Sequence, residues 1–400
     1  MAQEVMRLRV LTLSTLFPDA TRPNFGLFVE RQTLALASRS GVEVEVVAPV
    51  GLPPFPLSLG KRHGGLRGLP IAETWKGLVV HRPRFTSVPH LPARAPGTIA
   101  CALLPLLRDI RVRFPFDVVD AQFFWPDGPA AMRLSAALGL PFSAKARGGD
   151  IQYWKDRPGV GAQIVAAGRA AGGLLAVSAA LKEVMTKAGM PADAIAVHYT
   201  GIDRVQFRPV DRTAAKAALG VAGPLIVTVG ALIPRKGQAL AIEAMARLPD
   251  ATLLIVGRGP DERQLRDLIR ARGLQERVRL LGPRPHGELP GLMAAADVML
   301  LMSESEGLAN VWVEAMACGT PIVVGDIGGA REALALDGTG DATAGGRLAA
   351  FDPDAVAATV CAILADPPTQ NTVRAGVDRF SWERNAEQLE AHLRRVAGKP

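Results

Sequence analysis

The sequence predicts an α/β fold with two doubly wound parallel sheets. Strand-like and helix-like segments alternate along the 400 residues, a pattern typical of parallel sheets covered by helices on both faces. The alternation starts near residue 8 and again near residue 225. Between the two runs, residues 207–211 combine a proline with charged residues, which is typical of a hinge.

Each half begins with a buried-looking strand. In the first half, residues 8–13 and 42–47 are expected to be strands, with a turn-rich loop at 18–24 and a helix over 26–38 between them. A final helix over residues 381–396 begins with Ser381, a residue type that often caps helices. The strands expected in the second half cover residues 225–229, 252–256, 278–281, 298–301 and 322–324.

Length and composition indicate a globular protein of two or three domains. Of its residues, 48% are hydrophobic and 5% aromatic, which favours cores built from Ala, Leu and Val. We predict an N-terminal domain of residues 1–207, a C-terminal domain of residues 208–379 and a terminal helix within residues 380–400.

The sequence gives no sign of a metal site or a membrane span. Three cysteines have neither metal-ligand spacing nor even pairing, which favours a reduced, cytoplasmic protein. The N-terminal apolar run is too short for a signal peptide, and no segment reaches the ~18 apolar residues of a spanning helix. Asp352 and Asp354 form the only Asp-x-Asp sequence, and we interpret it as a helix cap.

The basic excess of the chain is concentrated in residues 61–113. The formal net charge is +8, and this segment holds ten Lys and Arg residues against two acidic residues. Within it, the apolar run 99–107 could rest on an anionic membrane surface. The alternative is a buried helix with a solvated basic flank, although Pro105 interrupts the helical period. Nucleic-acid binding is disfavoured because few aromatic residues lie among the basic ones.

The most informative segment places Glu306 and Glu314 eight positions apart around a predicted helix start. Ligands collect beyond the carboxyl ends of parallel strands, and exposed N–H groups at a helix start favour phosphate. We therefore predict a sugar nucleotide here, with one carboxylate on sugar hydroxyls and the other on the ribose. The alternative is a pair of solvated carboxylates. The backbone expected to hold the donor comprises Gly307, Leu308, Ala309, Asn310 and Val311.

Two cations, Arg235 and Lys236, follow the strand predicted at residues 225–229. Negative charge develops on the leaving oxygen when a nucleoside diphosphate departs, and charge-assisted hydrogen bonds from such cations stabilise it. The alternative is a pair of exposed loop cations. The sequence thus predicts a phosphate site after this strand.

These segments resemble the retaining glycosyltransferases of family 4, a group with the GT-B fold that includes bacterial cell-surface polysaccharide enzymes. The resemblance implies two Rossmann-like domains facing a central cleft, with the last helix returning to the first domain. Gly282 and Arg284 would then lie beside the nucleobase, and Gly26 would face the donor; an ordinary turn is the alternative for each. The similarity extends over residues 24–32, 200–203, 225–237, 254–260, 278–282 and 306–324.

One position departs from the family pattern. Arg147 stands where many relatives carry the histidine of a His-Gly-x-Asp motif that contacts the donor sugar, and Asp150 keeps the acidic position. The resemblance implies that Arg147 takes part in catalysis. Asp150 would accept a hydrogen bond from a substrate or cap the helix that follows.

The resemblance implies transfer of a hexose, with retention, from a UDP- or GDP-sugar to a saccharide acceptor in cell-surface polysaccharide biosynthesis. The acceptor is expected to be lipid-linked, and the protein cytoplasmic or peripheral on the inner membrane face. No cofactor is expected, because Arg235, Lys236 and helix N–H groups would meet the diphosphate charge. A non-hydrolysing sugar-nucleotide epimerase and a non-catalytic sugar-nucleotide-binding protein remain alternatives.

Overall fold

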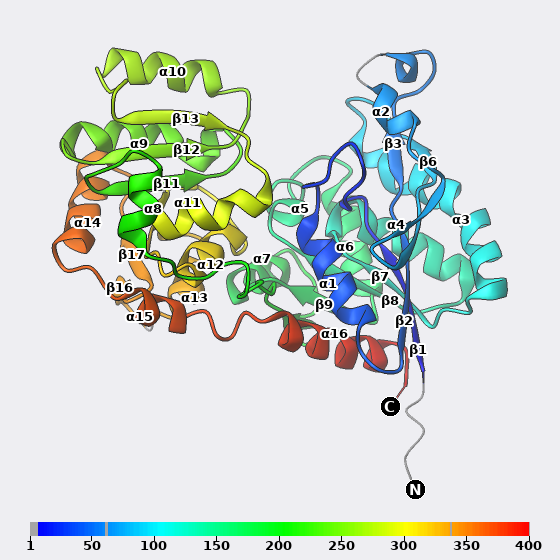
Figure 1. Cartoon of the computed structure of the whole chain (residues 1–400). Coiled ribbons are helices and arrows are strands. Elements are labelled where there is room, and N and C mark those ends of the chain that lie inside the picture. Colours follow the sequence, from blue (N-terminus) through cyan, green and yellow to red (C-terminus); the bar gives the residue numbers. More distant parts are fainter. Residues whose placement is uncertain (1–6, 61–62, 337, 400) are drawn as a thin grey trace, which may run out of the picture. The chain divides into compact units, whose positions relative to one another are not determined.

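The structure, a computed structural model, describes residues 7–60, 63–336 and 338–399. Contacts within the chain divide it into two units (Figure 1). Unit 1 comprises Met1–Gly201 and Trp382–Pro400, and unit 2 comprises Ile202–Ser381.

Unit 1 contains an eight-stranded sheet of order β10-β9-β8-β7-β1-β2-β5-β4. All its pairs are parallel except that of the edge strand β4 with β5, and β3 and β6 form a separate parallel pair. The strands are β1 (Leu8–Leu13), β2 (Val42–Val47), β3 (Val50–Leu52), β4 (Ala72–Trp75), β5 (Leu78–His81), β6 (Arg84–Thr86), β7 (Val118–Ala121), β8 (Phe142–Ala146), β9 (Gly173–Ala176) and β10 (Ile195–Val197).

The central strands of this sheet are buried at nearly every position, which requires cover on both faces. The helices that provide it and the shorter ones are α1 (Leu27–Ala37), α2 (Gly64–Arg67), α3 (Ala95–Arg113), α4 (Phe124–Leu138), α5 (Gly149–Gln152), α6 (Gly161–Ala170), α7 (Ala179–Lys187) and α16 (Trp382–Val396).

Unit 2 contains a seven-stranded sheet of order β13-β12-β11-β14-β15-β17-β16, parallel except for the edge strand β16. Its strands are β11 (Leu225–Val229), β12 (Thr252–Val256), β13 (Val278–Gly282), β14 (Val298–Leu301), β15 (Ile322–Gly325), β16 (Ala342–Thr343) and β17 (Gly346–Ala349). Its helices are α8 (Arg212–Ala218), α9 (Gln238–Ala244), α10 (Glu262–Ala271), α11 (Leu289–Ala295), α12 (Asn310–Ala317), α13 (Ala330–Leu334), α14 (Pro353–Ala365) and α15 (Gln370–Ala375).

The two sheets confirm the predicted α/β fold with two doubly wound units. In each sheet the strand order reverses direction at one place, between β1 and β7 in unit 1 and between β11 and β14 in unit 2. Ligands of open parallel sheets bind beyond the carboxyl ends of the strands at such a reversal. We therefore expect ligand-binding residues in the loops that follow β1, β7, β11 and β14.

Helix α3 replaces the interrupted pattern expected around Pro105. The helix runs through this proline without a break, with Pro105 on its exposed side. Ile99, Leu103 and Leu107 are buried in the core of unit 1. The apolar run 99–107 is therefore largely a core face of the helix, not a membrane-facing surface, which corrects one of the two expectations for this segment.

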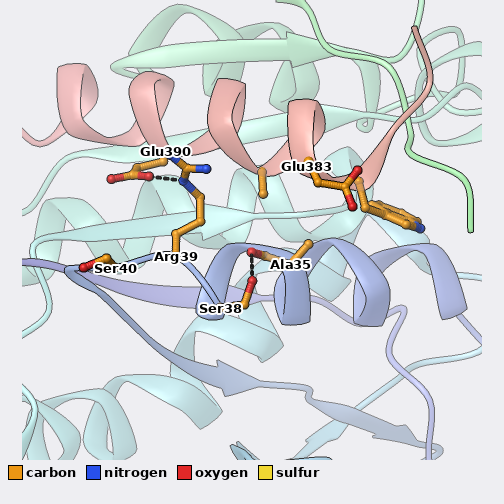
Figure 2. Close-up of a pocket in the computed structure, with 8 residues that line it drawn as sticks. Ala35, Ser38, Arg39, Ser40, Glu383 and Glu390 are labelled. Atoms are coloured by element: carbon orange, nitrogen blue, oxygen red, sulfur yellow. Dashed lines mark hydrogen bonds and ion pairs between the residues drawn. The ribbon is translucent and has the colours of Figure 1, made fainter. Parts of the chain in front are cut away.

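The last helix, α16, belongs to unit 1 and packs against α1, β7 and β8. Arg39, after α1, forms an ion pair with Glu390 of α16, and Figure 2 shows both at a pocket between the two helices. On the inner face of α16, His392 and the Ser143 hydroxyl are 2.9 Å apart. These contacts connect the final residues of the chain to its first helix and to the central sheet.

Candidate functional site

Two loops meet at the strand reversal of unit 2. β11 and β14 are neighbours in the sheet, and their loops carry Lys236 and Glu306 respectively. The Lys236 ammonium group forms an ion pair with a Glu306 carboxylate oxygen, across 70 positions of sequence. Both side chains are largely buried. The structure thus brings together two of the residues that the sequence singled out.

Arg235 lies beside the same pair of loops. Its guanidinium donates to the Ser305 carbonyl oxygen at 3.1 Å, while the Glu304 backbone N–H donates to the Arg235 carbonyl oxygen at 2.8 Å. The loops approach so closely at Gly237 that a Cβ there would overlap the Met302 carbonyl group. Gly237 also has a φ of 70°, which glycine adopts at low cost.

Glu314 has a different partner. It lies on α12, is buried, and has a carboxylate oxygen 3.1 Å from Nε2 of His286. His286 begins a short 3-10 turn, η6 (His286–Glu288), after β13, and its ring meets that of Phe207 edge to face at 5.3 Å. Sequence reasoning missed His286. The only feature of the sequence that pointed to it was its position shortly after residues 278–282, a segment that resembles the glycosyltransferase family.

The start of α12, where the sequence predicts a phosphate contact, has no side-chain cap among the described residues. N–H groups of its first turn therefore remain for a ligand. Leu308 and Ala309 are buried beside it, whereas Asn310 and Val311 are partly exposed. Gly328, after β15, passes so close to the Glu306 carbonyl group that any side chain would collide with it.

Gly282 and Arg284 follow β13. Gly282 has a φ of 70°, consistent with the sharp turn expected there. Arg284 forms an exposed ion pair with Glu288 at 3.6 Å. It lines a groove with Leu219, Arg279 and other residues between β13 and α11. The position of its side chain therefore agrees at least as well with an ordinary surface turn as with base recognition.

In unit 1, Asp150 fastens two loops at the carboxyl edge of the sheet. It is fully buried and accepts the backbone N–H groups of Phe124 at 2.7 Å, Arg147 at 2.9 Å and Gly148 at 2.8 Å. Burial raises the pKa of its carboxyl group, and these three N–H groups act in the opposite direction. Asp150 therefore connects the ends of β7 and β8, and it does not cap the following helix, where Gly148 holds that position.

Arg147 is held rigidly by neighbouring groups. Its Nε donates to the Gln122 carbonyl oxygen at 2.6 Å, a terminal nitrogen donates to the Gln122 side-chain oxygen at 2.6 Å, and the guanidinium lies 4.7 Å from the Phe28 ring centroid. Burial lowers the pKa of Arg147 to about 10, so it remains a cation at neutral pH. The arginine is thus a fixed positive charge at the edge of the unit 1 sheet.

Lys145, Gln32 and His198 form a buried polar network next to Arg147. It was not predicted from the sequence. The Lys145 ammonium donates to Oε1 of Gln32 at 2.8 Å and lies 2.9 Å from Nδ1 of His198. Burial lowers the pKa of both Lys145 and His198, and burial raises the pKa of nearby Asp120 to about 6. A buried lysine within a strand was the only local signal, because its partners come from distant parts of the chain.

Gly26 occupies a position that only glycine fills easily. Its φ is 74°, and a Cβ would collide with the Leu16 carbonyl group in the loop after β1. It precedes α1 directly. The glycine brings this loop and helix into close contact, whatever ligand the edge receives.

No group of three or more His, Cys, Asp or Glu residues that could hold a metal ion occurs within the described part of the chain. Asp352 accepts the backbone N–H groups of Asp354 at 2.9 Å and Ala355 at 3.0 Å at the start of α14. The interpretation of the Asp-x-Asp sequence as a helix cap is therefore confirmed.

Each half of the chain matches a different protein-family description. The family described as Glycosyltransferase Family 4 matches residues 28–206, and the family described as Glycosyl transferases group 1 matches residues 211–380. The chain belongs to the group 1 and family 4 glycosyltransferases. The predicted recognition is confirmed at this level.

Curated relatives of this glycosyltransferase include D-inositol 3-phosphate glycosyltransferases. That of Mycolicibacterium gilvum is 36% identical over 207 residues, which are 49% of this chain and 45% of the relative. That of Mycobacterium tuberculosis is 34% identical over 229 residues, or 54% of this chain and 47% of the relative. The matched region of this chain thus spans about half the length of these relatives.

Solved structures show that the glycosyltransferase has the GT-B fold. Sucrose-phosphate synthase from Thermosynechococcus elongatus gives a TM-score of 0.78 at 20% identity, covering 98% of this chain and 100% of its own. Anabaena HepE in complex with UDP gives 0.71 at 21% identity, covering 96% and 99%. At these identities the likeness establishes the fold and leaves the substrate to other arguments.

Proposed function

We propose that this protein transfers a hexose from a UDP- or GDP-sugar to a saccharide acceptor, with retention at the anomeric carbon. The observation that carries the proposal is the Lys236–Glu306 ion pair at the strand reversal of unit 2. HepE, a protein of the same fold, is described in complex with UDP and with UDP-glucose. A sugar nucleotide is therefore the substrate class that best suits this edge.

The donor supplies better partners for both members of the ion pair. A diphosphate carries more negative charge than one carboxylate. Lys236 therefore forms stronger charge-assisted hydrogen bonds when it turns from Glu306 to the diphosphate, and Arg235 binds the same group. Glu306, once released, accepts hydrogen bonds from hydroxyl groups of the sugar. In the absence of donor, the two charges satisfy each other in a largely buried position, which avoids leaving either one unpaired.

The remaining donor contacts come from α12 and its surroundings. Glu314 accepts hydrogen bonds from the ribose hydroxyls, with His286 orienting its carboxylate from 3.1 Å. N–H groups at Ala309, Asn310 and Val311 face the diphosphate, where the helix dipole favours negative charge. The negative charge that develops on departure of the diphosphate is thus met by groups already in position.

In unit 1, Arg147 offers a fixed cation to a substrate, and no side chain is assigned as a covalent nucleophile. The rigid contacts of Arg147 with Gln122 and Phe28 support such a role, since a preorganised charge needs no reorientation during the reaction. We further propose a lipid-linked saccharide of cell-surface polysaccharide biosynthesis as the acceptor.

Transfer assays on Lys236→Ala test the proposal. With one preorganised charged donor removed, sugar transfer should fall by about two orders of magnitude. The matched control is Arg266→Ala, which removes an exposed cation of α10 that pairs with Glu262, and it should transfer at the wild-type rate. Wild-type transfer by Lys236→Ala would overturn the assigned role, and appearance of a new sugar nucleotide without acceptor would indicate an epimerase instead.

A further inference from the structure

Three large apolar side chains are exposed within five residues of unit 1. Phe55, Leu57 and Leu59 are 79%, 61% and 58% exposed. They belong to the segment between β3 and α2, which stands at the upper tip of unit 1 in Figure 1. We call residues 55–59 the apolar tip. Single exposed apolar residues are common on soluble proteins, but a group of this size in a projecting segment indicates a contact surface.

The apolar tip has a defined backbone. Leu57–Leu59 form a 3-10 turn, η1, in which the Leu59 N–H donates to the Pro56 carbonyl oxygen at 2.9 Å. The Arg67 guanidinium in α2 donates to the Ser58 carbonyl oxygen at 2.6 Å. The turn is therefore shaped by local hydrogen bonds, and one of them places a cation against it.

The stretch of sequence that contains the apolar tip carries formal charge of one sign. Residues 46–72 contain no Asp or Glu, but include Lys61, Arg62 and Arg67. Lys61 and Arg62 lie outside the described residues, and they follow the tip directly in the sequence. Arg67 is exposed at its edge. An exposed apolar turn with the Arg67 guanidinium hydrogen-bonded to it complements a surface with anionic groups above an apolar interior.

An anionic lipid bilayer is the partner that fits this combination. A stable protein interface buries about 800 Å² on each partner, far more than three side chains on one turn present. Single-stranded nucleic acid would use the cations and stack successive bases on several aromatic rings, whereas the apolar tip offers one ring, that of Phe55, and two leucines. Within the described residues no helix has the length and apolar character to cross a bilayer.

We propose that the apolar tip inserts into the interfacial region of an anionic membrane, with Arg67 on the lipid phosphate groups. The surface would hold unit 1 where a lipid-linked acceptor presents its saccharide. The inference takes from the proposed function only the expectation of such an acceptor. It also moves the membrane contact away from residues 99–107, whose apolar side chains serve the core.

Vesicle flotation tests this surface directly. The whole protein should float with phosphatidylcholine vesicles that contain phosphatidylglycerol and remain unbound with phosphatidylcholine alone. A variant with Phe55→Ser, Leu57→Ser and Leu59→Ser should bind the anionic vesicles about tenfold more weakly or worse. Arg67→Gln should weaken vesicle binding about fivefold. Added salt should also weaken vesicle binding by the wild-type protein.

The matched control is Val112→Ser. Val112 is 88% exposed on α3 and lies between Arg111 and Arg113, so it pairs an apolar side chain with cations away from the tip. Its binding should equal that of the wild type. Each variant should keep the wild-type melting temperature and the wild-type rate of transfer to a soluble saccharide acceptor, which shows that unit 1, where the substitutions lie, remains folded.

Three results would overturn the inference: no binding of the wild type to anionic vesicles, equal binding by the triple serine variant, or loss of binding in Val112→Ser. Retention of RNA that depends on the tip, without vesicle binding, would assign the surface to nucleic acid. Transfer to a soluble saccharide acceptor tests the proposed function separately, because it requires no membrane.

Discussion

At the carboxyl edge of the unit 2 sheet, charged and polar side chains pair with one another, and a bound ligand can separate the members of a pair. Lys236 is paired with Glu306, and His286 lies beside Glu314. Both members of the first pair could be predicted from the sequence as contacts to one ligand, because each lies in the loop that follows a strand. The ion pair between them was not predicted. The second could not, since nothing in the local pattern around His286 indicates a carboxylate 28 positions away.

Removal of the Glu314 carboxylate should affect recognition of the ribose. Hydrogen bonds to a charged group contribute about 1.5–3 kcal/mol, so Glu314→Ala should raise KM for the donor by about tenfold or more. The wild type should also discriminate against a donor with deoxyribose, and the variant should lose that discrimination. Glu262→Ala, in an exposed pair with Arg266, is the control. Equal discrimination by wild type and Glu314→Ala would argue against a ribose contact.

The pH dependence of stability reports on Asp127. This buried residue of α4 accepts the Thr15 N–H at 2.9 Å, and burial raises its pKa to about 7. Between its ordinary value of 3.8 and about 7, the folded state binds more protons than the unfolded state, so this group lowers stability as pH rises.

Asp127→Asn keeps an acceptor for Thr15 but cannot ionise. Between pH 5 and pH 8 it should therefore gain about 2 kcal/mol of unfolding free energy relative to the wild type. Denaturant unfolding at the two pH values provides the measurement. A constant difference between the two proteins would show that Asp127 ionises in the folded state as easily as in the unfolded one.

At the scale of secondary-structure elements, some strands and helices could be predicted from the sequence and others could not. The strands β11, β12, β13, β14 and β15 of unit 2 could be predicted closely from sequence, because most are continuous apolar runs between turns. The short strands β16 and β17 were not predicted, because they are partly exposed and lack such a run. Helix α3 could not, because whether Pro105 breaks a helix depends on the face it occupies. The exposed position of Pro105 allows the helix to continue.

Gly237→Ala tests how tightly the two phosphate-site loops approach. Gly237 and Gly273 have φ values of 70° and 66°, but a Cβ at 237 would collide with Met302 whereas one at 273 would meet open space. Gly273→Ala should cost about 1 kcal/mol from its backbone conformation alone. Gly237→Ala should cost clearly more and lower transfer. Equal losses of stability in denaturant unfolding would show that the loops separate easily.

At the scale of the whole molecule, the polar groups gather at one edge of each sheet. In unit 1, Asp150, Arg147 and the network of Lys145 lie at the ends of β7 and β8. The sequence indicated Arg147 and Asp150 through the resemblance. The partners of Arg147, Gln122 and Gln32, lie 25 and 115 positions away, and His198, which contacts Lys145, lies 53 positions from that lysine. Such partners depend on tertiary packing and leave no local pattern.

Because Arg235, Lys236 and the start of α12 supply the positive charge proposed for the diphosphate, transfer should not require a divalent cation. EDTA should leave the initial rate nearly unchanged. Loss of turnover in EDTA, restored by added Mg²⁺, would show that these groups are insufficient. The initial rate with donor and acceptor, before and after chelation, is the quantity to compare.

The central claim is that Lys236 and Glu306, paired in this structure, separate to receive one sugar nucleotide. A crystal structure with the UDP- or GDP-sugar that gives the larger thermal shift tests it most directly. We predict the diphosphate on Arg235 and Lys236, the sugar hydroxyls on Glu306 and the ribose on Glu314. An intact Lys236–Glu306 ion pair with the nucleotide bound elsewhere would contradict the account.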